Sequence, residues 1–137
     1  MADQQMVVPQ VPHKTDRRIF TPKDHVTDQE ISPLDHMLYA DDDVDVLIWW
    51  AEPGKTHLDI HKHPQSAHVY FIMEGQGEAL LGNGVWQQVK AGDVIVNPRN
   101  KVHALRNTMQ SGRLIWTSAT AVGAGPYVMV PCSEDEE

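Results

Sequence analysis

The chain has 137 residues, with 19 acidic and 11 basic side chains that give a formal charge of −8 at neutral pH. This acidic balance argues against a nucleic-acid partner, and the single cysteine, Cys132, excludes an internal disulfide framework and fits a reducing compartment. No apolar run approaches the roughly 20 residues of a spanning helix and the first residues lack a signal-peptide pattern, so we expect a cytoplasmic protein with no membrane partner.

The first 40 residues are polar and broken by four prolines, which indicates an arm with at most a short edge strand. From Val44 the pattern changes to short apolar runs separated by turn residues. Expected strands lie at 44–51, 56–63, 67–73, 77–81, 85–89, 93–97, 102–107, 113–118 and 128–130. The Asn83-Gly84 pair predicts a tight hairpin. Strands at this spacing predict an all-β sandwich or barrel over 41–131, after the arm at 1–40 and before an acidic tail at 132–137.

Four histidines have the spacing of ligands to one metal ion. His61 and His63 are two residues apart, so on a strand both imidazoles project from the same face. His68 and His103 would complete the shell from neighbouring strands. A lone histidine in a β-protein is more often a hydrogen-bonded core or surface residue, but four at these offsets favour a mononuclear metal site. His68 could instead support the ligands from outside, which would leave a three-histidine site.

Two groups of residues carry a resemblance to a known family. The first group is Gly54, His61, His63, His68 and Gly75, and the second is Gly92, Pro98, Asn100, His103 and Asn107. Together they resemble the two motifs of the cupin superfamily, over about residues 44–120. The resemblance implies a cupin-type double-stranded β-helix, that is, a jelly-roll β-sandwich or barrel. His68 stands where cupins usually have glutamate, and Asn100 stands where they usually have glycine; asparagine tolerates the left-handed backbone that glycine usually supplies there.

Other side chains are expected near the metal. Asp59 lies two residues before His61 on the same strand face, where it could act as a general base or accept a hydrogen bond from an imidazole, or could lie at the rim in water. For His57 the rim is the better expectation. The remaining candidates would line the pocket because they share a strand face with a ligand or are large aromatic residues: Tyr70, Ile72, Leu105, Asn107, Trp50 and Trp116. Such a pocket suits a small apolar or aromatic substrate.

The ligand set bears on the chemistry. Four neutral imidazoles leave the full dipositive charge on the ion, which favours Lewis acidity: polarising a carbonyl or binding an enolate. We expect one divalent ion, zinc first, with iron, manganese or nickel as alternatives. Four-histidine cupins that this chain resembles include zinc-dependent polyketide cyclases of antibiotic biosynthesis, which implies aldol-type cyclisation of an apolar poly-ketone through enolates. One alternative is an Fe(II) dioxygenase acting on a diketone or an aromatic diol. The other is a non-enzymatic cupin that binds small molecules and has a structural metal.

Assembly is a further expectation. The apolar strand from Val44 to Trp50 would be a long exposed edge if it lay in water, and small cupins resemble one another in forming dimers. A homodimer is therefore expected.

Overall fold

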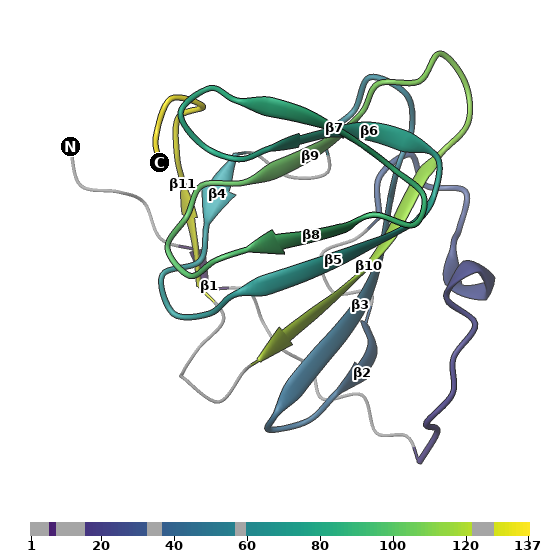
Figure 1. The fold of residues 1–137 in the computed structure, drawn as a ribbon. Coiled ribbons are helices and arrows are strands. Elements are labelled where there is room, and N and C mark those ends of the chain that lie inside the picture. Colours follow the sequence, from purple (N-terminus) through teal and green to yellow (C-terminus); the bar gives the residue numbers. More distant parts are fainter. Residues whose placement is uncertain (1–5, 8–15, 33–36, 57–59, 122–127) are drawn as a thin grey trace.

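The computed structural model describes residues 6–7, 16–32, 37–56, 60–121 and 128–137, and it shows an almost purely β protein (Figure 1). The largest sheet has five strands in the order β2-β3-β10-β5-β8, which are Met37–Ala40, Val44–Ala51, Leu114–Ala121, His68–Glu74 and Val94–Asn97. A second sheet, in the order β7-β6-β9, consists of Trp86–Lys90, Gln76–Leu80 and Ala104–Asn107. A small third sheet, β1-β11-β4, consists of Met6–Val7, Val128–Pro131 and His61–Lys62.

The sheets form a sandwich. In Figure 1 the β7-β6-β9 sheet lies across from the five-stranded sheet, and β4 and β11 stand at one end of the space between them. The expected all-β architecture is confirmed. The helical structure of the described residues is limited to a short 3-10 helix, η1 (Pro22–His25), and no helix among them could span a membrane.

The core lies between the two larger sheets. Strand side chains alternate between the two faces, so every second residue of β3, β5 and β10 points inward. The interior cluster combines these with a residue of β8 and with residues of the opposite sheet: Leu47, Trp49, Ala51, Tyr70, Ile72, Ala79, Val89, Ile95, Leu105, Leu114 and Trp116. A second cluster covers the outer face of β3, where Ile48, Trp50 and Ile115 pack with Leu38 of β2 and with Phe20 and Val26.

The two consecutive tryptophans face opposite sides, and the expectation for Trp50 is wrong. Trp50 belongs to the outer cluster, and its indole N–H donates to the carbonyl of Gln29 at 2.8 Å. Trp49 occupies the interior, where its indole N–H donates to the hydroxyl of Ser118 at 2.7 Å. Because the strand period is two, only one of the pair can face the interior, and the register of β3 against β10 places Trp49 there.

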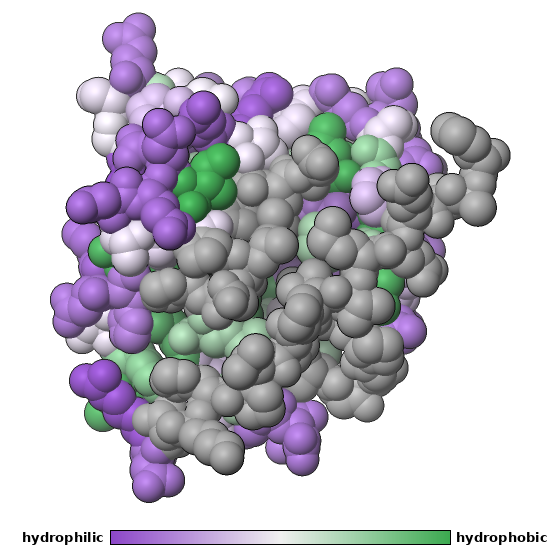
Figure 2. Space-filling model, turned by 180° about the vertical axis from the view of Figure 1, so that it is seen from behind, coloured by the Kyte–Doolittle hydropathy of each residue, from purple (hydrophilic) through white to green (hydrophobic). Residues whose placement is uncertain are grey.

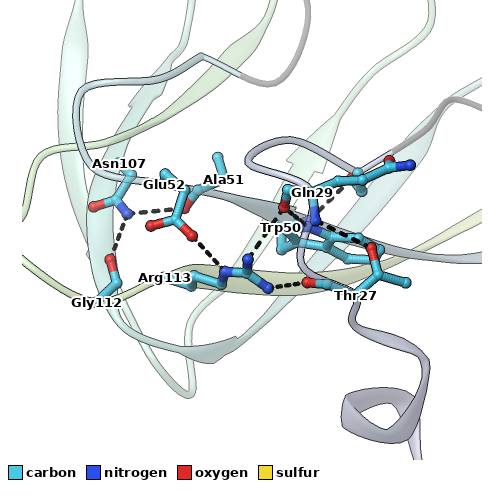
Figure 3. A network of polar contacts seen from close by, with 9 residues as sticks. Thr27, Gln29, Trp50, Ala51, Glu52, Asn107, Gly112 and Arg113 are labelled. Atoms are coloured by element: carbon cyan, nitrogen blue, oxygen red, sulfur yellow. Dashed lines mark hydrogen bonds and ion pairs between the residues drawn. The ribbon is translucent and has the colours of Figure 1, made fainter.

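A network around Arg113 holds the chain before β2 against the sheet (Figure 3). The Arg113 guanidinium donates to Glu52 Oε1 at 2.6 Å and to the backbone carbonyls of Thr27 and Gln29. Trp50 donates to the same Gln29 carbonyl. This network explains why the outer face of β3 is covered: a fixed segment of the N-terminal region lies over it.

Two turns have the backbone conformations that the sequence predicts. The hairpin between β6 and β7 is confirmed, with Asn83 at φ 54° and Gly84 at φ 70°. The acidic residues at the C-terminal end pack beside this hairpin, because the amide of Gly84 donates to the Glu134 carbonyl and that of Asn83 to the Glu136 carbonyl. Asn100 also takes the left-handed conformation expected of it, at φ 64°.

Candidate metal centre

Three buried imidazoles converge at the end of the sandwich. His61 begins β4, His63 follows that strand, and His103 precedes β9. One ring nitrogen of each lies within 4.8 Å of the others, and all three residues are at most 3% exposed. The backbones of His61 and His103 form a reciprocal pair of hydrogen bonds, 2.8 and 3.2 Å long, so the two ligand-bearing segments are fixed relative to each other.

Backbone carbonyls orient two of these rings. Nδ1 of His63 lies 2.8 Å from the carbonyl oxygen of Val128, and Nδ1 of His103 lies 3.1 Å from that of Lys101. A carbonyl only accepts, so each Nδ1 must carry the hydrogen, and the lone pair is then on Nε2. Nε2 of His103 is buried and has no hydrogen-bond partner. In His103, therefore, one ring nitrogen donates to a backbone oxygen and the other has no partner, which is the arrangement that metal-ligating histidines adopt.

The protonation state also suits a metal. Burial and, after it, the charge of His61 together lower the pKa of His63 to about 3. Burial, followed by the charges of His61 and His63, holds the pKa of His103 well below its usual value. At neutral pH both rings are therefore uncharged, which is the form that binds a cation. The three histidines fit a divalent ion.

His68 reaches the same place from the five-stranded sheet. Its ring stacks on that of His63, with centroids 3.8 Å apart and an interplanar angle of 17°. Its Nδ1 lies 3.0 Å from the Thr120 hydroxyl and its Nε2 lies 3.3 Å from the Ser66 hydroxyl. Burial is the main cause that lowers the pKa of His68, so this ring is neutral too. Its role as a fourth ligand stays a prediction.

The register of the strands places a row of polar side chains beside His68. Asp45 of β3 pairs with Thr120 of β10, Thr120 pairs with His68 of β5, and His68 pairs with Asn97 of β8. All four residues are at most 4% exposed. Residues directly opposite in antiparallel strands have their side chains on the same face, so this polar row crosses the interior of the sheet.

The comparisons with known proteins agree with this geometry. Residues 48–120 match the cupin domain family. The chain belongs to the cupin family. No curated protein matches its sequence.

Solved structures resemble this cupin over most of its length. A double-stranded β-helix protein from Klebsiella pneumoniae, itself uncharacterised, is 27% identical with a TM-score of 0.75, over 86% of this chain and 100% of that one. A protein from Bacillus halodurans is 18% identical with a TM-score of 0.67, over 90% and 96%. The polyketide cyclase RemF from Streptomyces resistomycificus is 19% identical with a TM-score of 0.57, over 70% and 66%. The double-stranded β-helix fold expected from the sequence is thereby confirmed.

The residues expected to line the pocket of the cupin lie in different parts of the structure. Tyr70 lies in the interior with its ring centroid 6.0 Å from that of His103, and Ile72, Leu105 and Trp116 belong to the same interior cluster. Trp50 faces the other side of the sheet, as described above. His57 and Asp59 lie outside the described residues, so their expected roles stay predictions.

Two surface hollows of this cupin lie away from the histidines. One, of about 270 Å³, is lined mainly by polar residues that include Gln76, Gln88 and Asp93. The other, of about 310 Å³, lies among Leu81, Val96, Lys101 and Glu137, with other residues of the same region. Neither is lined by any of the four histidines, so the metal centre, rather than a hollow, identifies the candidate site.

Asn107 contributes to the fold through all of its polar atoms. Its amide nitrogen donates to the carbonyls of Ala51 and Gly112, both at 2.9 Å (Figure 3). Its oxygen accepts from the amide of Met109. The side chain is 1% exposed. It therefore joins the end of β3 to the turn between β9 and β10 and has no free donor to offer a substrate.

Asn107→Ala is expected to lower the free energy of unfolding by about 2–3 kcal/mol, because it leaves buried backbone groups without partners. Urea unfolding followed by tryptophan fluorescence measures this change. Gln110→Ala, at an exposed position of the same turn, should leave the stability within about 0.5 kcal/mol of wild type. An Asn107→Ala variant as stable as wild type would show that the three hydrogen bonds do not support the fold.

Proposed function

We propose that this protein is a metal-dependent cupin enzyme that catalyses aldol-type cyclisation of an apolar poly-ketone. The observation that carries the proposal is the convergence of three buried imidazoles, with His63 and His103 neutral, into a group that contains no carboxylate among the described residues. Neutral ligands leave the charge of a divalent ion uncompensated, and that charge is what an enolate needs. We also propose that the protein acts in a biosynthetic pathway and is located in the cytoplasm.

His61, His63 and His103 would hold the ion, for which we propose zinc, and His68 is the proposed fourth ligand. Once bound, the ion would supply Lewis acidity to a ketone oxygen. The stacking of the His68 ring on that of His63 supports the proposal of His68 as a ligand. RemF shares the fold at 19% identity, a likeness that supports the architecture and not the reaction.

The interior residues suit an apolar chain. Ile72, Leu105 and Trp116 belong to the same interior cluster as Tyr70, whose ring centroid lies 6.0 Å from that of His103. Apolar surroundings of this kind would exclude water and strengthen electrostatic interactions at the site. Burial raises the pKa of Tyr70, so its hydroxyl stays protonated and can donate a hydrogen bond to an oxygen but cannot act as a base. Asp59 is the proposed base, on the grounds of its position two residues before His61.

A dioxygenase is the second candidate, and one observation favours it. The nitrogens that lie within 4.8 Å of one another belong to three histidines, without His68. A three-histidine shell leaves more positions open on an iron ion, as a dioxygenase acting on a diketone or an aromatic diol requires.

Assays of zinc-loaded and iron-loaded protein, each with and without oxygen, separate the two functions. Because Zn²⁺ has no accessible redox couple, a Lewis-acid cyclase should convert a poly-β-ketone substrate fully with zinc and without oxygen. Product analysis by mass spectrometry measures the turnover, and Asp59→Asn should lower it about 100-fold while the bound zinc is retained. Turnover that needs both iron and oxygen would contradict the cyclase proposal and support the dioxygenase.

We still propose a homodimer, but its interface would not be the strand β3 that the sequence suggested. β3 lies between β2 and β10 and its outer face is covered, so it does not form an exposed edge. Exposed apolar side chains instead lie on the outer face of β5 and β8, namely Phe71, Met73, Val94 and Val96. On the face seen in Figure 2, apolar atoms of the described residues are visible in several places, some of them beside hydrophilic residues.

A further inference from the structure

One member of the polar row beside His68 has a buried hydrogen-bond donor without a partner. Asn97 is the last residue of β8 and is 4% exposed. Its amide nitrogen, Nδ2, has no hydrogen-bond partner. Burying an amide N–H without an acceptor is unfavourable, and an apolar side chain of the same size would avoid that cost. The neighbouring inward position of this strand holds such a side chain, Ile95.

The strand geometry directs Asn97 toward the histidines. β8 alternates between exposed and buried residues, with Val96 60% exposed and Asn97 on the opposite, interior side. Asn97 lies directly opposite His68, so the two side chains share one face, and the His68 ring stacks on His63. Asn97 also borders the hollow of about 310 Å³ on the outside, but Nδ2 has less than 1 Å² of accessible surface, so solvent in that hollow does not satisfy it.

The chemistry of the group restricts what it can bind. A carboxamide nitrogen has no available lone pair, so Nδ2 does not bind a cation, and it serves only as a donor to an acceptor atom. The next two residues along the row are already paired with each other, because Nδ1 of His68 lies 3.0 Å from the hydroxyl oxygen of Thr120. The partner that Nδ2 lacks is therefore a hydrogen-bond acceptor brought in from outside the protein.

We propose that Asn97 is a ligand-binding residue of the histidine site, and that its amide N–H donates to an oxygen of a bound carbonyl or enolate compound. A donor at this position would fix the orientation of the oxygen-bearing end of the ligand beside His68. The unpaired N–H lowers stability in the empty protein and becomes paired when the ligand enters. This inference rests on the proposed function only in placing an oxygen ligand at the histidines.

The test compares wild type with Asn97→Leu, in which the amide is replaced by an apolar group of similar size. The probe is pentane-2,4-dione, a β-diketone, titrated into zinc-loaded protein by isothermal calorimetry. The variant should bind the probe roughly 10- to 100-fold more weakly, the effect expected for loss of a hydrogen bond to a charged oxygen. Zinc affinity, measured by competition with a chelator, should stay within about twofold of wild type, since Asn97 is not a ligand. The metal-free variant should melt at the same temperature as wild type or higher.

A matched control and a second variant make the outcomes decisive. Ile95→Val shortens the adjacent inward side chain of β8 and should lower the melting temperature without changing probe affinity. Asn97→Ala replaces Asn97→Leu if the leucine does not fit, and should show the same weaker probe binding. Unchanged probe affinity in the variants, or no binding of the probe to zinc-loaded wild type, would overturn the proposal. So would a fall in melting temperature and zinc affinity together, because that result indicates a structural role. None of these readouts needs turnover, so failure of the cyclase reaction would leave this inference standing.

Discussion

His103→Ala is expected to abolish stoichiometric metal binding while leaving a folded protein. His103 supplies a buried Nε2 that has no hydrogen-bond partner, while its Nδ1 donates to the Lys101 carbonyl. Removing a ligand should cost more than the 10- to 100-fold in affinity that is lost when a group supporting a ligand is removed, so we expect a loss of more than about 100-fold. Elemental analysis after dialysis against metal-free buffer measures the metal content, and circular dichroism checks the fold.

Two matched variants sharpen this experiment. His25→Ala removes a histidine of η1, outside the group, and should retain one ion per chain. His68→Ala distinguishes the two shells: a loss as large as that of His103→Ala indicates four ligands, and a loss of about tenfold indicates that His68 supports three. A full equivalent of tightly bound metal in His103→Ala would show that this group is not the metal centre.

The metal-free protein is expected to lose stability steeply as the pH falls below about 6.5. The pKa of His63 is about 3 in the folded protein and about 6.5 in an unfolded chain, so between these values the unfolded state binds the extra proton. Stability contributed by the neutral ring is therefore complete above pH 6.5 and declines toward pH 3. Burial lowers the pKa of His68 and His103 in the same direction. Each group can contribute about 1.4 kcal/mol per pH unit within its window, so the slope can approach ~4 kcal/mol per unit.

Urea unfolding of metal-free protein at pH 8, 7, 6 and 5 measures this slope. Because a domain of this size has only about 5–15 kcal/mol of stability, the metal-free protein should unfold without denaturant near pH 5 or below. Bound zinc should raise stability at pH 7 and lose this effect on acidification, as protons compete for the same nitrogens. His63→Leu should have a smaller slope than wild type. Equal stability of metal-free wild type at pH 7 and pH 5 would contradict the assignment of these histidines as buried and neutral.

Several features were predictable because they depend on short stretches of the chain. The two-residue spacing of His61 and His63 places both rings on one side of a strand, and the structure brings them together with His103. The Asn83-Gly84 turn and the left-handed Asn100 follow from the backbone preferences of asparagine and glycine. Most strand positions follow from alternating apolar residues bounded by turn residues, which is a local property as well. The strand expected at 56–63 is the exception, because its described residues form only the short strand β4 (His61–Lys62).

Features that depend on how the strands pair could not be predicted from short stretches of the sequence. Whether Trp49 or Trp50 faces the interior is decided by the register of β3 against β10, and by the Arg113 network that fixes a cover on the outer face. Asn107 donates a hydrogen bond to Ala51, which is far away in the sequence, so its structural role could not be predicted from the motif that contains it.

The surroundings of the site were decided in the same way. Thr120 meets His68, and Asn97 lies opposite it, because β10 and β5 and then β5 and β8 are paired across long stretches of chain. The sequence by itself determined the fold class and the pairing of His61 with His63, since both depend on residue types at short, regular spacings, and it assigned His103 through its motif. Only the tertiary structure decided which polar groups surround those histidines and which donor is left for a ligand, because strand pairing sets the neighbours of every inward side chain.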